Sequence, residues 1–233
     1  MEAKGEIKKI VIIGPESTGK STLCEQLAAH YNTVWVREYA REYLEKNGTD
    51  YTFENLYEIA VGQISGEEDT TTDHRRTTNG KTTDNRQQTT EKATTDNRQQ
   101  TTEKETTDNR QPTTENTNDL NLQPSTFNFE PIFIDTDLYV MKVWSEFVFD
   151  KCDNRILTQI TKRKYDLYLL CNTDLPWVAD NLREYPDLES RAKLFHYYKE
   201  DMTEQHVPWV IISGNYEERL AMAIEAVDKL LHG

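Results

Sequence analysis

A glycine-rich segment from Gly14 to Thr22 holds the residues best suited to chemistry. It reads GPESTGKST and matches G-x-x-x-x-G-K-[ST], the Walker A pattern. Glycines allow successive backbone N–H groups to turn toward an anion, and a helix that begins near Ser21 adds its positive N-terminal end. In this pattern Lys20 reaches the β- and γ-phosphates of ATP, and the Ser21 hydroxyl ligates Mg²⁺. The predicted ATP-binding residues are Gly14, Pro15, Glu16, Ser17, Thr18, Gly19, Lys20, Ser21 and Thr22.

Carboxylates follow two other apolar segments. Asp135 directly follows PIFI at 131–134, where an acidic side chain can hold Mg²⁺ or its water. Glu38 follows TVWV at 33–36, on the side where a kinase needs a carboxylate to orient or deprotonate a hydroxyl. We expect Glu38 to do this, with Asp135 as the competing candidate. Asp137 either caps the next helix or contacts the substrate.

Further polar and aromatic residues lie where they could complete a site. Tyr39 and Arg41 come just after Glu38, so we expect them among the substrate contacts. Arg183 and Arg191 follow the fourth apolar strand, where they could close over ATP and stabilise charge on the transferred phosphoryl group; the alternative is two surface arginines. Trp177 is either a substrate contact or core packing. Glu16 is unusual in an anion-binding loop, and it either faces solvent or touches the substrate end.

Short apolar strands alternate with helical patterns along the chain. This alternation predicts an α/β fold of three layers, α/β/α, around a five-stranded parallel sheet. Ligands bind beyond the carboxyl ends of such strands, which is where the residues above fall. The expected strands are 7–13, 33–36, 131–134, 167–171 and 209–213, and the expected helices are 21–31, 39–46, 52–64, 138–149, 154–160, 188–202 and 216–231.

One stretch, residues 66–126, departs from this pattern. Its only apolar residues are Ala93, Leu120 and Leu122, and TTDNRQ recurs every 12 residues from Thr82. Such a polar composition cannot offset the entropy of ordering a chain, so it predicts a disordered low-complexity insertion. We therefore expect residues 1–233 to form a single domain interrupted by this insertion, which is either neutral or a tether for a partner.

Composition excludes several classes of protein. The net charge of −14 argues against a general nucleic-acid binder, because neutralising phosphates requires a basic surface. The chain has 3 cysteines without C-x-x-C spacing, which argues against a disulfide framework and a zinc site. No apolar segment is typical of a signal peptide or a membrane helix. We expect a soluble, cytoplasmic protein whose partners are small molecules, with no nucleic acid or membrane among them.

Five segments in this order resemble the NadR-type nicotinamide riboside kinase domain, a P-loop NTPase: GPESTGKSTL, VREYARE, FIDTDLYV, LCNTDLPWVADNLRE and ISGNYEERL. The resemblance covers roughly residues 7–65 and 127–231. It implies a nucleoside-kinase-like fold and Mg²⁺-dependent transfer of the ATP γ-phosphate to nicotinamide riboside, which gives nicotinamide mononucleotide, a precursor of NAD. It also implies that Arg183 and Arg191 belong to a lid, and that Gly214 and Asn215 form the adenine-side loop.

The sequence departs from that family at two points. The adenylyltransferase motif [HT]-x-G-H is absent, so we expect a stand-alone kinase. The family holds the pyridine ring between aromatic side chains, and Arg37 stands at one of those positions. The alternatives are therefore a kinase for another nucleoside or nucleotide, or a non-catalytic nucleotide-binding regulatory module.

Overall fold

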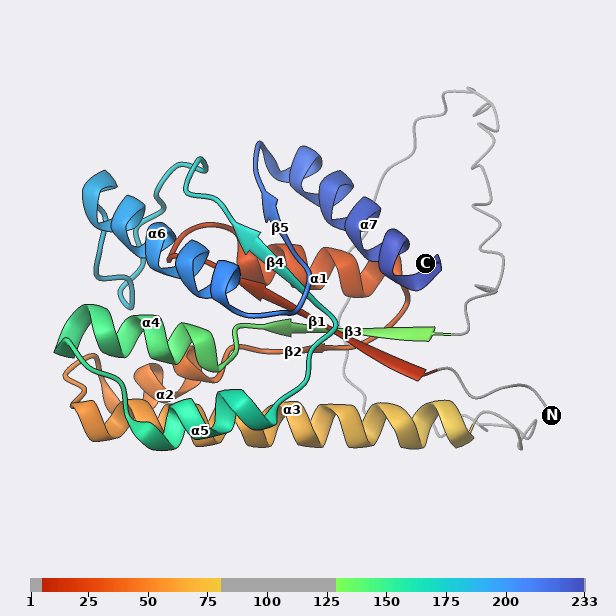
Figure 1. Ribbon diagram of the computed structural model, residues 1–233, viewed down its shortest axis with the longest axis horizontal. Coiled ribbons are helices and arrows are strands. Elements are labelled where there is room, and N and C mark those ends of the chain that lie inside the picture. The colour runs from red at the N-terminus through yellow and green to blue at the C-terminus, as the bar shows by residue number, and fades with distance from the viewer. Residues whose placement is uncertain (1–5, 81–128, 233) are drawn as a thin grey trace, which may run out of the picture. The chain divides into compact units, whose positions relative to one another are not determined.

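Five parallel strands run through the middle of the protein (Figure 1). The structure is a computed structural model, and it describes residues 6–80 and 129–232. The strands are β1 (Glu6–Ile13), β2 (Trp35–Val36), β3 (Phe129–Asp135), β4 (Leu167–Cys171) and β5 (Trp209–Ile212). Their order across the sheet is β2-β3-β1-β4-β5. The expected five-stranded parallel sheet is therefore confirmed.

The central strands are long because their residues are β-branched or otherwise apolar and are covered on both faces. Ile10 to Ile13 and Ile132 to Ile134 have no measurable exposure. The register pairs Ile12 with Asp135 across β1 and β3, so the carboxylate stands at the same level as the end of β1. This register brings Asp135 next to the glycine-rich loop that follows Ile13.

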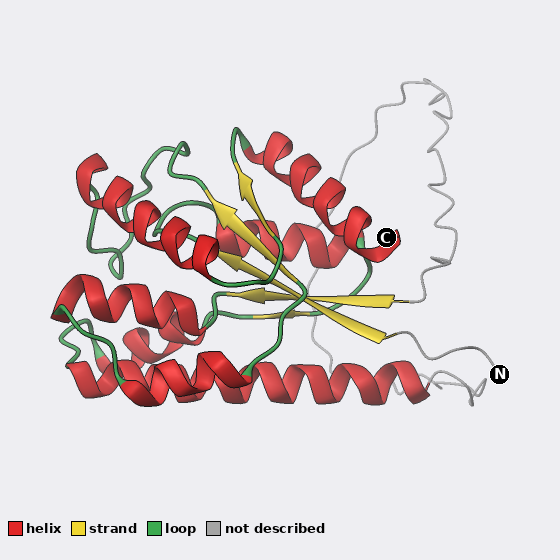
Figure 2. Cartoon of the chain, viewed as in Figure 1, coloured by secondary structure: helices red, strands yellow, loops and turns green. Residues whose placement is uncertain are grey.

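Helices cover both faces of the sheet, as Figure 2 shows. The helices are α1 (Lys20–His30), α2 (Tyr39–Asn47), α3 (Phe53–Gly80), α4 (Leu138–Phe149), α5 (Asn154–Lys162), α6 (Leu188–Glu204) and α7 (Tyr216–His232). Side chains from α1 and α7 pack on one face, and side chains from α2 to α6 pack on the other. The expected three-layer architecture is confirmed. No helix within the described ranges has both the length and the apolar composition needed to cross a membrane.

Helix α3 is much longer than the sequence analysis predicts. It continues through residues 66–80, which were expected to be disordered. Buried polar side chains recur at helical spacing along this part of α3: Gln63, Glu67, Thr71 and His74. This part of the helix therefore packs through polar side chains. The prediction that residues 66–80 are disordered is wrong, because polar side chains pack this part of the helix without apolar residues. Residues 81–126, with the 12-residue repeat, lie outside the described residues.

Candidate active site

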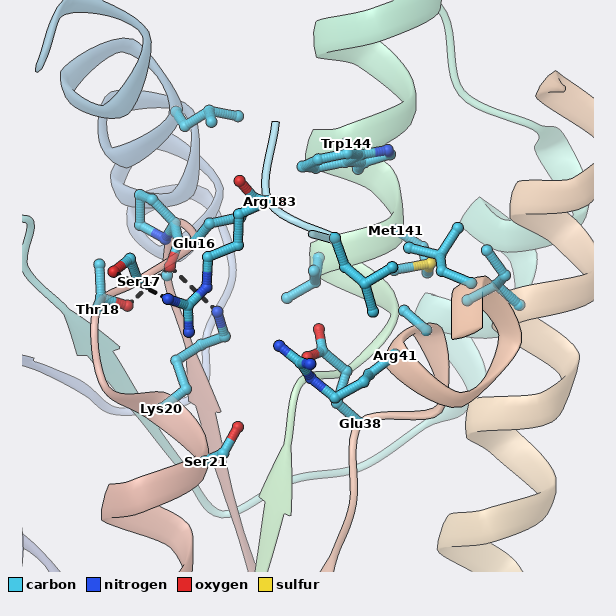
Figure 3. Close-up of a pocket in the computed structure, with 18 of the residues that line it drawn as sticks. Glu16, Ser17, Thr18, Lys20, Ser21, Glu38, Arg41, Met141, Trp144 and Arg183 are labelled. Atoms are coloured by element: carbon cyan, nitrogen blue, oxygen red, sulfur yellow. Dashed lines mark hydrogen bonds between the residues drawn. The ribbon is translucent and has the colours of Figure 1, made fainter. Parts of the chain in front are cut away.

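A cavity opens beyond the carboxyl ends of β1 and β3, between the glycine-rich loop and helices α2, α4 and α6 (Figure 3). It is lined by Gly14, Pro15, Glu16, Ser17, Thr18, Gly19, Lys20, Ser21, Thr22, Glu38, Ala40, Arg41, Leu44, Tyr51, Leu56, Ile59, Val140, Met141, Trp144, Leu182, Arg183, Leu194 and Tyr198. Polar and charged groups lie on the side of the loop, and apolar side chains from α4 lie across from them. All nine predicted loop residues thus contribute to one cavity.

Two glycines give the loop its course. Gly14 has φ 138°, and a Cβ there would lie 2.6 Å from the Cys171 carbonyl oxygen, so only glycine fits. Gly19 has φ 80° and directly precedes α1. The Thr18 hydroxyl donates to the Pro15 carbonyl at 2.8 Å and closes the turn. The resulting curl leaves the first N–H groups of α1 without intrahelical partners, which is the arrangement that binds phosphate.

Lys20 extends from the start of α1 into the cavity. Its ammonium donates to the Pro15 carbonyl at 3.1 Å and lies on the same side as Arg183 in Figure 3. Two cations that line the cavity thus lie beside the loop, Lys20 from α1 and Arg183 from the segment between β4 and α6. Such a pair can stabilise the charge that develops on a transferred phosphoryl group.

Asp135 is a buried carboxylate with one oxygen that lacks a hydrogen-bond partner among the described residues. Its exposure is 1%, and the oxygen in question is Oδ1. Burial, followed by repulsion from Glu38, raises the pKa of Asp135 to about 7, while Lys20 and a hydrogen bond with Ser21 act in the opposite direction. A buried polar atom without a partner is rare in native proteins and points to an ion or another ligand.

The oxygens of Ser21 and Asp135 fit Mg²⁺, which takes hard oxygen ligands and often keeps several waters and phosphate oxygens. Within residues 6–80 and 129–232, no cluster of three or more His, Cys, Asp or Glu side chains could hold a metal ion by itself. A cation bound at Ser21 and Asp135 would therefore draw its remaining ligands from phosphate and water. That requirement agrees with the position of both residues beside the glycine-rich loop.

Asp137 has a different role from the one expected of a substrate contact. Its Oδ1 accepts the Tyr139 N–H at 2.9 Å and caps α4, and its Oδ2 accepts the Tyr168 hydroxyl at 2.8 Å. The side chain is 2% exposed and is not part of the cavity lining. Capping and Tyr168 occupy both oxygens of Asp137, so the capping alternative describes the structure; substrate binding by Asp137 stays a prediction.

The segment that begins α2 forms the wall opposite Lys20. Glu38 and Arg41 line the cavity, and Arg41 Nη2 donates to Asp180 Oδ2 at 2.9 Å. Tyr39 does not line the cavity. Gln63 fixes this wall, since its Oε1 accepts the Tyr39 N–H at 2.7 Å and its amide donates to the Thr136 carbonyl at 3.1 Å. Gln63 thus joins the end of β3 to the start of α2, a role that no pattern in the sequence indicates.

The two predicted lid arginines lie in different surroundings. Arg183 lines the cavity, and its Nη1 donates to the Val178 carbonyl at 2.5 Å and to Ser17 Oγ at 3.4 Å. Arg191 lies in α6, is 2% exposed and donates to the Leu175 carbonyl at 3.2 Å. The Trp177 ring packs 5.6 Å from the Arg191 guanidinium. The same ring lies 6.0 Å from the Arg183 guanidinium, so Trp177 packs between the two arginines; neither Arg191 nor Trp177 lines the cavity.

The predicted adenine-side loop lies at the end of β5, outside the cavity lining. Asn215 caps α7 by accepting the Glu217 and Glu218 N–H groups. Arg219, which the sequence analysis did not identify, is 2% exposed and donates to the carbonyls of Gly214 and Thr18 at 2.8 and 3.0 Å. It thereby ties the glycine-rich loop to the end of β5.

The apolar wall of the cavity carries an aromatic residue that the sequence analysis missed. The Trp144 ring, from α4, lies across the cavity from the glycine-rich loop, with Met141 one turn earlier (Figure 3). Trp144 Nε1 donates to the Tyr51 hydroxyl at 2.8 Å. Trp35, by contrast, packs against the other face of the sheet. The spacing of apolar residues along α4 indicates a buried helix face. It does not show which of these residues line a cavity.

Comparison with known proteins agrees with this architecture. A family model described as an AAA domain matches residues 9–219. The chain is similar to the trifunctional NAD biosynthesis/regulator protein NadR of Escherichia coli (strain K12), with 23% identity over 228 residues, covering 97% of this chain and 43% of the relative. The chain thus spans less than half the length of the curated relatives it matches. The resemblance to NadR-type domains is confirmed.

Solved structures establish the fold. A crystal structure of the NadR protein in complex with NR has a TM-score of 0.63 at 19% identity, and the match covers 97% of this chain and 50% of that one. Thymidylate kinase from Ehrlichia chaffeensis has a TM-score of 0.52 at 7% identity, with 95% and 99% covered. The nucleoside-kinase-like P-loop fold expected from the sequence is therefore confirmed.

Proposed function

We propose that this chain, which belongs to the AAA domain family, is an ATP-dependent kinase that phosphorylates nicotinamide riboside. The product would be nicotinamide mononucleotide, a precursor of NAD, formed in the cytoplasm. The proposal rests on similarity to NadR, including the NadR structure in complex with NR, together with the geometry of the cavity.

One observation carries the proposal: groups suited to each part of phosphoryl transfer surround a single cavity. Lys20 and Arg183 bring two cations to the phosphate side, and Glu38 brings a carboxylate to the opposite side. Asp135, beside Ser21, keeps an oxygen that has no partner among residues 6–80 and 129–232. A module that only binds a nucleotide has no need for a carboxylate on the acceptor side.

In the proposed reaction, a hydroxyl oxygen of the acceptor attacks the γ-phosphorus of ATP. The new O–P bond forms while the bond from the γ-phosphorus to the β–γ bridging oxygen breaks, and ADP leaves. Glu38 takes the hydroxyl proton, and Lys20 and Arg183 stabilise the charge on the equatorial oxygens. Mg²⁺ held by Ser21 and Asp135 would neutralise charge on the β- and γ-phosphates.

Glu38 is the better base of the two candidates. It lines the cavity, whereas Asp135 lies beneath it at 1% exposure and beside Ser21. A general base must come within hydrogen-bond reach of the proton that it removes, so access decides the choice. Asp135 then serves as the metal ligand.

The apolar wall supports an acceptor with a planar ring. Trp144 offers a large aromatic surface whose N–H is already satisfied by Tyr51, so stacking leaves no polar group unpaired. A nucleoside monophosphate is the second candidate acceptor. Arg41 favours it, because its guanidinium lines the acceptor side and can pair with a phosphate.

ATP consumption with Mg²⁺ tests the proposal. We expect the purified protein to consume ATP with nicotinamide riboside, and not with uridine, thymidine or nicotinamide mononucleotide. Lys20→Ala is the matched control for a contaminating ATPase. Turnover only with a monophosphate would favour the second candidate, and ATP binding without turnover on any acceptor would instead support a regulatory module.

A further inference from the structure

Two residues of the glycine-rich loop contact another part of the chain. Glu16 Oε2 accepts the backbone N–H groups of Glu184 and Tyr185 at 3.0 and 3.4 Å. Ser17, at φ 56°, accepts the Val178 N–H on its Oγ at 2.9 Å. All three donors belong to residues 172–187, which connect β4 to α6 and which we name the β4–α6 segment. The side chains of Glu16 and Ser17 thus hold backbone groups of the protein.

The β4–α6 segment is held at the apolar wall as well. Glu184 Oε2 accepts the Tyr51 hydroxyl at 3.0 Å, and that hydroxyl accepts the Trp144 Nε1–H at 2.8 Å. The Tyr185 ring packs against Trp144 at 5.6 Å between centroids. Glu184 therefore links the two sides of the cavity: its backbone N–H binds Glu16, and its side chain binds Tyr51, which in turn binds Trp144.

Arg183 lies in the sequence between Val178 and Glu184, whose N–H groups bind Ser17 and Glu16. It directly precedes Glu184, and its guanidinium lies beside Lys20 and Ser17 in Figure 3. Fixing the amides of the next two residues fixes the backbone from which Arg183 projects. A catalytic cation must be held close to its productive geometry, since small displacements cost much of its effect.

A carboxylate in this loop is otherwise unfavourable. Burial raises the pKa of Glu16, which means that its charged form is disfavoured there, and a negative charge repels bound phosphate. The contacts with Glu184 and Tyr185 give it a compensating role that neither solvent exposure nor phosphate binding provides.

We propose that Glu16 is a positioning residue for Arg183: by holding the Glu184 and Tyr185 amides, it places the Arg183 guanidinium beside Lys20. This inference rests on the proposed kinase function and adds to it the reason why an acidic residue occupies the phosphate-binding loop. A direct contact between Glu16 and the acceptor is the competing role.

Variants of Glu16 separate these roles. Glu16→Gln keeps an oxygen that can accept both N–H groups, whereas Glu16→Ala removes it. Glu25→Ala, which removes an exposed carboxylate from α1, is the matched control. Amide hydrogen exchange of the full chain, read at single residues by mass spectrometry, reports on the contact without requiring activity.

We expect Glu16→Ala to speed exchange at Glu184 and Tyr185 and to lower kcat, each by about 10- to 100-fold, the effect of losing hydrogen bonds to a charged group. The KM for the acceptor should stay the same. Glu25→Ala should behave as the wild type, and Glu16→Gln should keep amide exchange at Glu184 and Tyr185 slow. In an Arg183→Ala background, Glu16→Ala should lower kcat no further, because the group that it positions is gone.

Three results would overturn the proposal: unchanged exchange at both amides in Glu16→Ala, an undiminished loss of kcat in the Arg183→Ala background, or a raised acceptor KM in Glu16→Gln. If the wild-type protein turns over no acceptor, the proposed function fails instead. The exchange rates then still decide whether Glu16 holds the segment.

Discussion

A carboxylate is buried at each end of the sheet, and the two carboxylates differ in how many partners they have. Glu67, from α3, is 2% exposed and meets three partners: Lys9 Nζ at 2.7 Å, the Tyr165 hydroxyl at 2.8 Å and Arg163 Nη1 at 3.4 Å. Asp135, at the carboxyl end of β3, is 1% exposed, and its Oδ1 has no partner among the described residues. The two carboxylates are thus equally buried, but of the two only Glu67 has partners among the described residues for both of its oxygens.

The difference separates a structural carboxylate from a functional one. A buried charge with partners is retained in the fold at little net cost, whereas one without a partner destabilises the fold unless a ligand completes it. A shifted pKa alone does not make this distinction. Burial also raises the pKa of Asp137 to about 7, yet both of its oxygens are occupied by partners within the protein.

Replacing Lys20 tests the functional end with the largest expected effect. Lys20→Ala should lower kcat/KM by about 1000-fold, roughly 4 kcal/mol, because it removes a cation from the phosphate side. Its one described hydrogen bond, to the Pro15 carbonyl, predicts little change in the free energy of unfolding. Chemical denaturation beside steady-state kinetics measures both. A large loss of stability would break the comparison, because the loop would then be part of the structural framework.

Replacing Glu67 tests the structural end. Glu67→Ala should lower the free energy of unfolding by about 3 kcal/mol, because it removes the buried carboxylate that pairs with the partly buried Lys9 and Arg163. Turnover per folded molecule should not change. Glu68→Ala is the control: Glu68 pairs with the same Arg163 but its side chain is 66% exposed, so the loss should stay below about 1 kcal/mol. Equal losses in the two variants would refute the role of burial.

Replacing Glu38 sharpens the comparison within the functional end. Glu38→Gln should lower kcat by about 100-fold, near 2.7 kcal/mol, because it removes the proposed base but keeps the shape of the side chain. The affinity for ATP should not change, since Glu38 lies on the acceptor side. Full activity in this variant would assign proton removal elsewhere and leave Asp135 as the candidate.

Local patterns predicted what local physics determines. Strand β4 lies at the predicted residues because LYLLC is an uninterrupted apolar run. Lys20 and Ser21 are predicted from the Walker A spacing, because the conformation of the glycine-rich loop requires that spacing. Asp135 followed from its place at the end of a buried strand, a position that parallel sheets bring to the ligand-binding edge.

The features that the sequence did not predict depend on tertiary contacts, which cannot be inferred from the type of a single residue. Helix α3 extends past Ile64 because Lys9 and Tyr165, distant in sequence, satisfy Glu67. Both predicted lid arginines lie near the Trp177 ring, but Arg191 is buried and donates to the Leu175 carbonyl, whereas Arg183 lines the cavity. Trp144 looks like any other apolar residue of α4 until the cavity is known.

The most direct measurement compares Asp135→Asn with the wild type, as kcat and as free energy of unfolding against pH. The pKa of Asp135 rises from an ordinary value near 3.8 to about 7 in the folded protein, so stability falls as pH rises between those values and stays low above pH 7. The shift in Asp137 is common to both proteins and cancels in the difference.

We expect Asp135→Asn to lose at least about 100-fold in kcat. Its stability relative to the wild type should rise from pH 4 to pH 7, by at most about 4 kcal/mol at 1.36 kcal/mol per pKa unit. A variant that is both less active and less stable at neutral pH would contradict this expectation, because Asp135 would then be a structural carboxylate like Glu67.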